Sequence, residues 1–204
     1  MVELYSLHPL SIYKKLHKEY LKYRHYKYAI YKPNKKSLDK TVSKKLSKKN
    51  KSAILFASGP SVNKLNFKKV QTLAKDKDMD IFMVNTIPGS ELKNYFNPNY
   101  YIASDPHLLS LFGNPGIIHE NNIYNICIKN IVSDQCKVFV PLGTKISGIN
   151  EDRLHYFNNC ELLGSYNTFD ITKPRNYTGN TAYISLAVAC YLGYKKIYII
   201  GYDI

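Results

Sequence analysis

Residues 195–204 read KKIYIIGYDI, and this stretch decides the class of fold. A β-branched, apolar run of this length is typical of a buried strand in a parallel sheet, and the Gly-Tyr-Asp after it marks where the strand ends. In open sheets of parallel strands, ligands bind beyond the carboxyl ends of the strands. We therefore expect a ligand site beside these last residues. Because no loop follows this strand in the sequence, we also expect the domain to be incomplete at its C-terminus.

Working back from this strand, short apolar runs alternate with helical patterns. The runs predicted as strands are residues 53–57, 80–85, 100–104, 121–128 and 136–142. A helix is predicted over residues 63–75, and an alanine-rich, apolar helix over residues 181–192, ending at Gly193. This alternation predicts an α/β fold, a Rossmann-like, doubly wound and mostly parallel sheet.

The positive charge of the chain is unevenly distributed. Residues 1–52 hold 15 Lys and Arg against 3 Asp and Glu, a net charge of +12, whereas the remainder holds 14 against 12, a net +2. No run of 18 apolar residues and no signal-peptide pattern is present, so we expect a cytoplasmic protein. The cysteines lack metal-site or disulfide spacing and are interpreted as buried thiols: Cys127, Cys136, Cys160 and Cys190.

The basic charge lies in an N-terminal arm, residues 1–33, and in a Lys/Ser-rich segment, residues 34–52. Within the arm, residues 10–31 predict an amphipathic helix with an apolar stripe and many lysines, ending near Pro33. The second segment is predicted to be a linker too polar to pack, leading into a Rossmann-like domain over residues 53–204. The arm suits an anionic membrane surface at the inner face of the cytoplasmic membrane. A docked helix or solvated tail is the alternative, and nucleic acid is disfavoured because the domain is nearly neutral.

Polar residues follow three of the predicted strands. They are Ser58, Gly59, Pro60 and Ser61 after the first strand, Asn85 after the second, and Ser104 and Asp105 after the third. Because parallel strands end at one edge of a sheet, we expect these residues to line one crevice. Gly59 would let a phosphate approach the backbone, and Ser61 would meet its charge. Asn85 would bond a base or ribose, and Asp105 a ribose hydroxyl. Each is also an ordinary turn or cap when taken singly, but together they predict a nucleotide-type site.

Three more residues are candidates for this site. Thr181 opens the apolar helix after Thr-Gly-Asn, where free N–H groups attract an anion, although an ordinary capping turn is the alternative. His107 is an acid–base candidate or a solvated loop residue, and Asp203 either faces the crevice or frays with the chain end. No metal-binding pattern is present, and Asp105 and His107 are the only catalytic candidates.

Several stretches resemble known families. The turn at residues 57–61 is similar to the Gly-Pro-Ser turn of bacterial sialyltransferases of glycosyltransferase family 42 and of MptE-like 6-hydroxymethylpterin diphosphokinase domains. Residues 178–203 resemble a block that both groups carry, and residues 80–85 resemble the sialyltransferase strand that ends in a nucleotide-contacting asparagine. Asp105-Pro106 looks like the MptE-like element, where the sialyltransferases carry Asn-Pro. The resemblance covers residues 53–204.

The resemblance implies a nucleotide pocket formed by Ser58, Gly59, Pro60, Ser61, Asn85, Asp105 and Thr181. It further implies a sialyltransferase-like glycosyltransferase of bacterial lipopolysaccharide or capsule assembly. Such an enzyme takes a nucleotide-activated sugar, here a CMP-sugar, and a glycan or lipid-linked acceptor, with no tightly bound cofactor. The alternatives are an MptE-like pyrophosphokinase that uses ATP and Mg²⁺, or a non-catalytic truncated fragment. The sialyltransferases carry their catalytic histidine after the Gly-x-Asp strand, where this sequence has nothing, so we expect little turnover from this chain alone.

Overall fold

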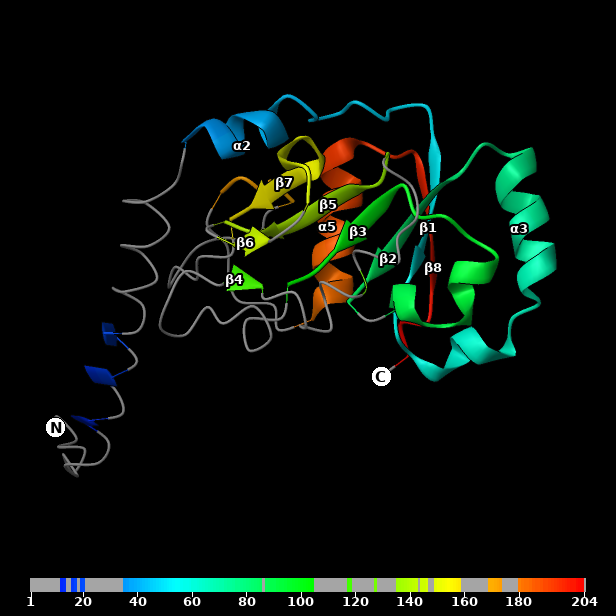
Figure 1. Cartoon of the computed structure of the whole chain (residues 1–204), viewed down its shortest axis with the longest axis horizontal. Helices are drawn as coiled ribbons and strands as arrows, with labels where there is room; N and C mark the ends of the chain where they lie inside the picture. The colour runs from blue at the N-terminus through cyan, green and yellow to red at the C-terminus, as the bar shows by residue number, and fades with distance from the viewer. Residues whose placement is uncertain are drawn as a thin grey trace, which may run out of the picture.

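A sheet of six parallel strands forms the centre of the molecule, with the strands in the order β7-β5-β3-β2-β1-β8 (Figure 1). The computed structural model describes residues 12–13, 16–17, 19–20, 35–85, 87–104, 117–118, 127, 135–142, 144–146, 149–158, 169–173 and 180–203. The six strands are β1 (Ser52–Phe56), β2 (Asp80–Val84), β3 (Tyr100–Ile102), β5 (Lys137–Pro141), β7 (Leu154–Phe157) and β8 (Lys196–Ile200). A separate parallel pair consists of β4 (Ile117–Ile118) and β6 (Lys145–Ile146). The predicted α/β class is confirmed.

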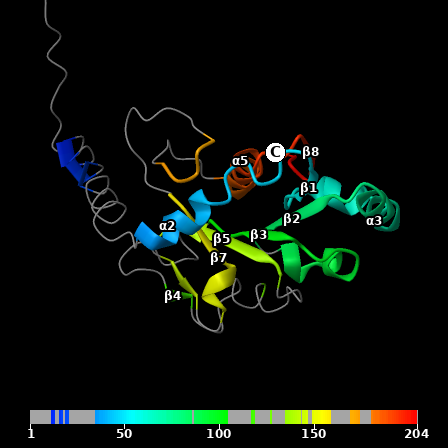
Figure 2. The same cartoon turned by 90° about the horizontal axis from the view of Figure 1, so that it is seen from above.

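Helices cover the sheet, which lies between α3 (Phe67–Asp76) and α5 (Thr181–Leu192) in Figure 2. Helix α5 is apolar all round because it packs across β1, β2 and β3, and most of its residues are buried. It ends at Gly193, whose φ of 86° is favourable for glycine and closes the helix as the sequence predicted. The sheet is therefore wound on both faces, as in Rossmann-like folds.

The central strands are buried on both faces. In β1 and β2 nearly every residue is inaccessible, and Phe56, Phe82 and Tyr101 are among the largest fully buried side chains. Burying a side chain of this size stabilises the fold by about 1.5–3 kcal/mol, so these aromatic residues hold the sheet to its helices. The apolar runs at residues 53–57 and 80–85 were predicted as strands for this reason, and both predictions are confirmed.

Strand β8 is not buried as its apolar sequence predicted. Among the described strands it pairs with β1 alone and lies at the edge of the sheet, where Tyr198 is 40% and Ile199 is 42% exposed. A continuous apolar run is typical of a strand covered on both faces. Its exposure at an edge shows that the run identified a strand without identifying its place in the sheet.

Other predicted elements differ in their boundaries. The helix predicted over residues 63–75 is divided into a 3-10 turn, η1 (Pro60–Lys64), and α3, because Asn66 caps a new helix by accepting a hydrogen bond from the Lys69 N–H (3.1 Å). Strand β7 was not predicted, and the run at 136–142 forms β5. The prediction at 121–128 lies outside the described residues apart from Cys127, which is helical.

The Lys/Ser-rich segment packs on the domain, so the prediction that it is too polar to pack is wrong. Its first part is a helix, α2 (Lys35–Val42), which lies against β7. Thr41 is fully buried there, and its hydroxyl both donates to the carbonyl of Tyr156 (2.8 Å) and accepts from its N–H (3.1 Å). Helix α2 is held on the sheet because Thr41 forms hydrogen bonds with both main-chain polar groups of Tyr156.

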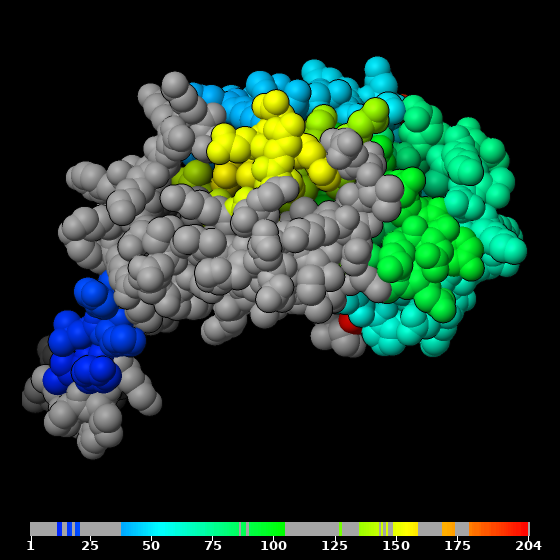
Figure 3. Space-filling view, viewed as in Figure 1, coloured from blue at the N-terminus to red at the C-terminus, as the bar shows by residue number. Residues whose placement is uncertain are grey.

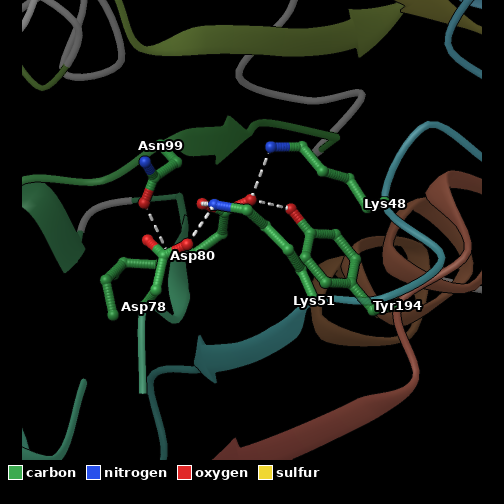
Figure 4. Close-up of polar contacts among 7 residues, drawn as sticks. Lys48, Lys51, Asp78, Asp80, Asn99 and Tyr194 are labelled. Atoms are coloured by element: carbon green, nitrogen blue, oxygen red, sulfur yellow. Dashed lines mark hydrogen bonds and ion pairs between the residues drawn. The ribbon is translucent and has the colours of Figure 1, made fainter. Parts of the chain in front are cut away.

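The second part of this segment crosses the amino edge of the sheet and is held by a buried carboxylate (Figure 4). Asp80, only 5% exposed, lies 2.8 Å from the Lys48 ammonium and accepts a hydrogen bond from the Tyr194 hydroxyl. Burial disfavours the charge of Lys48, but the hydrogen bond to Asp80 and the charge interactions with Tyr100 and Asp80 together outweigh burial and raise the pKa of Lys48. Lys51 pairs with Asp78 (2.8 Å) beside this group. The lysines of the Lys/Ser-rich segment were predicted to prevent it from packing on the domain. Their pairing with Asp78 and Asp80 of the domain offsets this effect.

The described residues of the N-terminal arm are 12–13, 16–17 and 19–20, and all six are helical. They lie at one end of the molecule, dark blue in Figure 3, away from the strands. Within the described residues, no helix has the length and apolar composition needed to cross a bilayer. Cys127 and Cys136 are buried and Cys190 is half-buried, while Cys160 lies outside the described residues.

Candidate functional site

The three predicted strand ends meet at one edge of the sheet. Because β1, β2 and β3 are adjacent and parallel, Ser58, Asn85 and Ser104 follow them on the same side. The amino end of α5 and the end of β8 reach this edge too, which brings Thr181 and Asp203 to it. The predicted common edge is therefore confirmed.

Gly59 is a glycine because the end of β8 packs against it. Its N–H donates to the carbonyl of Gly201 (2.7 Å), and a Cβ at this position would lie 2.6 Å from that carbonyl oxygen and 2.9 Å from Cγ of Asp203. No side chain fits in this space. The sequence interpretation was that Gly59 leaves room for a phosphate, but the space is occupied by the chain itself.

Ser61 also meets a negative charge that belongs to the chain. Its N–H donates to Oδ2 of Asp203 (2.6 Å), and its hydroxyl donates to Oδ1 of the same carboxylate. These bonds lower the pKa of Asp203, so this exposed carboxyl is charged at neutral pH. Ser61 was predicted to meet the negative charge of a phosphate. In the structure the negative group beside it is the carboxylate of Asp203, which thereby lies next to the turn after β1.

Asn85, Ser104 and Thr181 form a hydrogen-bonded group next to this turn. The Thr181 hydroxyl oxygen lies 3.0 Å from Nδ2 of Asn85, which donates to it, and 2.6 Å from the hydroxyl of Ser104. Asn85 has a φ of 48°, a left-handed conformation that asparagine tolerates better than most residues, and its carbonyl accepts from the Tyr101 hydroxyl (2.6 Å). The Thr181 hydroxyl thus fixes the side-chain amide of Asn85, and the Tyr101 hydroxyl fixes its main-chain carbonyl.

The other end of that amide has no hydrogen-bond partner among the described residues. Among the described residues, Oδ1 of Asn85 is buried and accepts no hydrogen bond. A buried acceptor without a donor costs about 1–3 kcal/mol, so a ligand that donates to Oδ1 recovers this free energy. The sequence had named Asn85 as a base or ribose contact, and this geometry suits a donor group.

Helix α5 directs its amino end at the same edge. The Asn180 side chain caps the helix by accepting from the Ala182 N–H (2.9 Å). The remaining N–H groups of the first turn and the aligned peptide dipoles favour a negative group there. Thr178 and Gly179, which the sequence also predicted as anion contacts, lie outside the described residues.

A cleft of about 270 Å³ opens between the β1 turn, the end of β8 and the start of α5. The residues that line it are Ala57, Ser58, Gly59, Pro60, Asn180, Ala182, Gly201, Tyr202 and Asp203. Of the predicted site residues, Ser58, Gly59 and Pro60 line this cleft directly. Asn85 and Thr181 belong to the adjacent hydrogen-bonded group, and Asp105 and His107 lie outside the described residues.

The site prediction missed some of the lining residues. Ala182 and Tyr202 were not named as contacts, although the sequence contains a signal for them, whereas Asn180 belongs to the predicted anion-binding turn at residues 178–181. Gly-Tyr-Asp follows a predicted strand, and Asn180 precedes a predicted helix. The strand-end rule that identified Ser58 and Asn85 applies equally to Tyr202.

No three His, Cys, Asp or Glu side chains of the described residues gather where they could hold a metal ion. A scan of protein-family models finds no match for this chain, and a search of curated proteins finds none either. The likeness to sialyltransferases and MptE-like domains therefore stays a prediction from the sequence.

Proposed function

We propose that the cleft at the carboxyl edge of the sheet binds a nucleotide, and that the nucleotide is the activating group of a sugar donor. The observation that carries this proposal is a cleft formed by the β1 turn, the end of β8 and the amino end of α5, with the hydrogen-bonded group of Asn85, Ser104 and Thr181 beside it. Parallel α/β sheets bind ligands at this edge, and a helix amino end attracts phosphate. The volume of the cleft, about 270 Å³, is close to the lower end of known small-molecule pockets.

Each part of the nucleotide has a matching group in the site. The phosphate faces the first turn of α5, whose N–H groups and dipole favour negative charge. The Asp203 carboxylate, on the opposite wall, accepts hydrogen bonds from ribose hydroxyls, as acidic side chains do in other doubly wound folds. The ring of Tyr202 offers a surface on which a base stacks, and Oδ1 of Asn85 accepts from an amino or hydroxyl group.

The proposed reaction is glycosyl transfer, as the resemblance to sialyltransferases implies. An acceptor hydroxyl oxygen attacks the anomeric carbon, the bond from that carbon to the phosphate oxygen breaks, and the nucleotide leaves with the bonding electrons. The site contributes by holding the donor in position and stabilising the charge on the leaving phosphate. The acceptor proton passes to a general base, for which Asp105 and His107 are our candidates.

The test is to measure nucleotide binding with variants that leave the fold intact. In Asn85→Gly the positive φ is retained and the side-chain amide is lost, and in Thr181→Val only the hydroxyl is replaced by a methyl group. Calorimetric titration with CMP, UDP, GDP and ATP, with and without Mg²⁺, identifies the preferred nucleotide. Loss of one buried polar contact should weaken its binding by about 5- to 150-fold.

Thr72→Val on α3, whose exposed hydroxyl donates to the carbonyl of Lys68 in its own helix, is the matched control and should bind as the parent chain does. Circular dichroism verifies that each variant is folded. The proposal fails if no nucleotide binds, or if Asn85→Gly and Thr181→Val bind as tightly as the control. Binding that requires Mg²⁺ and prefers ATP would instead favour the pyrophosphokinase alternative.

A further inference from the structure

The N-terminal arm presents large apolar side chains to solvent along one helical face. Ile12, Tyr13, Leu16 and Tyr20 are 38%, 64%, 64% and 57% exposed. Their spacing of three and four residues places them on one side of the helix. Leaving four such side chains in water is unfavourable, so this face, which we name the arm stripe, is suited to an apolar partner.

The charges of the arm identify the kind of partner. Residues 10–31 contain six Lys and Arg and one Glu. From the sequence alone, a helical period predicts Lys14, Lys15, Lys18 and Lys22 on the side opposite the arm stripe. A helix with apolar and aromatic residues on one face and lysines on the other is typical of segments that lie in the surface of an anionic bilayer. Tyrosine in particular is enriched at the boundary between headgroups and acyl chains.

Lysines that follow the arm pair with acidic side chains of the domain. Each of four lysines after the arm has a carboxylate oxygen of the domain within 4 Å, in the pairs Lys40–Asp152, Lys45–Asp170, Lys48–Asp80 and Lys51–Asp78. The arm itself carries six Lys and Arg over residues 10–31. Phosphates of a nucleic acid would neutralise its lysines but leave Leu16 and Ile12 in water.

We propose that residues 10–31 bind flat on an anionic lipid surface, with the arm stripe inserted among the headgroups and the lysines held by the negative surface potential. This inference stands on the arm alone and is independent of the nucleotide site. It places the domain beside a bilayer, where a lipid-linked acceptor would be within reach.

The experiment measures binding of the full chain to vesicles by flotation. Vesicles of phosphatidylcholine alone are compared with vesicles that contain phosphatidylserine in addition. We expect binding to the anionic vesicles that weakens as salt rises. The double variant Tyr13→Ser, Leu16→Ser should bind at least about tenfold more weakly, because two apolar side chains no longer enter the bilayer. The matched apolar control is Leu73→Ser on α3, where Leu73 is 41% exposed, and it should bind as the parent does.

A second pair of variants tests the charge. Replacing Lys14, Lys15 and Lys18 by Gln should weaken binding by about 100-fold, since each lysine near an anionic surface contributes about a fivefold factor. The control replaces Lys68, Lys69 and Lys75, exposed lysines of α3, and should have little effect.

Three results would overturn the proposal. The first is equal binding to neutral and anionic vesicles, or no binding to either. The second is binding to single-stranded RNA that the Lys variants abolish and the Tyr13→Ser, Leu16→Ser variant leaves unchanged, which would assign the arm to a nucleic acid. The third is a dimer in sedimentation analysis that Tyr13→Ser, Leu16→Ser converts to a monomer, which would assign the arm stripe to a second copy of the chain.

Discussion

Ser61 and Asp203 lie 142 residues apart in the sequence, yet the Asp203 carboxylate accepts hydrogen bonds from both the N–H and the hydroxyl of Ser61. This contact joins the turn after the first strand of the sheet to the end of the last strand. It also decides the electrostatics of the candidate site, because the negative charge beside the Gly-Pro-Ser turn is supplied by the chain itself.

Replacing Asp203 by Asn should lower the melting temperature slightly at pH 7, and the difference should vanish in acid. The hydrogen bonds from Ser61 lower the pKa of Asp203 below its ordinary value of about 3.9. A carboxyl with a lowered folded pKa stabilises the fold above its unfolded pKa, and this contribution is lost as the pH falls through the folded pKa. Melting curves of parent and variant between pH 7 and pH 2 test this. The control Asp39→Asn, an exposed carboxyl of α2, should show a pH profile parallel to the parent's.

Replacing Gly59 by Ala should destabilise the domain by about 1–3 kcal/mol. The added methyl group would lie 2.6 Å from the Gly201 carbonyl oxygen, so β8 must shift away from β1. Urea unfolding measures the change. Ser58→Ala, one residue earlier at an exposed position, should stay within about 0.5 kcal/mol of the parent. An equal effect of both changes would mean that packing against β8 is not what requires the glycine.

Replacing Tyr194 by Phe should lower the free energy of unfolding by about 1.5–3 kcal/mol, the range for a hydrogen bond to a charged group. The Tyr194 hydroxyl donates to the buried Asp80 carboxylate, which Lys48 also contacts. Without the hydroxyl, the carboxylate loses a donor that water cannot replace. Tyr198→Phe, at a site that is 40% exposed, is the matched control and should be near neutral. Similar losses in both variants would remove the case for a specific role of Tyr194.

Stability should fall between about pH 6.5 and pH 4 because of His155. Burial, with Lys40 and Lys137 nearby, lowers the pKa of His155 from 6.5 to about 4, and the residue is 1% exposed with its ring stacked on Phe139. In this pH range the unfolded chain binds a proton that the folded chain does not, so the free energy of unfolding drops as the pH falls. The loss amounts to about 3 kcal/mol.

The test is urea unfolding of the parent and of His155→Phe, which retains an aromatic ring against Phe139, at several pH values. The variant should lose most of this slope, while His17→Phe in the exposed arm should keep it. An unchanged slope in His155→Phe would assign the acid sensitivity to other groups.

The sequence predicted those parts of the fold that have a local signal. Residues 53–57 and 80–85 are apolar because β1 and β2 are buried on both faces, and Gly193 ends α5 where the pattern indicated. Strand β7 was missed because its four residues, LHYF, are too short to show a period and include a histidine. Helix α2 was missed because its composition is polar and its stability comes from Thr41 and its contacts on β7.

The sequence by itself predicted the parallel sheet and the edge at which Ser58, Asn85 and Ser104 lie. The reason is that parallel strands have their carboxyl ends on the same side of the sheet. The tertiary structure alone decided that Asp203 reaches Ser61, that β8 is the last of the described strands in the sheet, and that Tyr202 borders the cleft. The physical reason is distance along the chain. Periodicity records whether a residue is buried, whereas the partner that buries it depends on the order of strands brought together from remote segments.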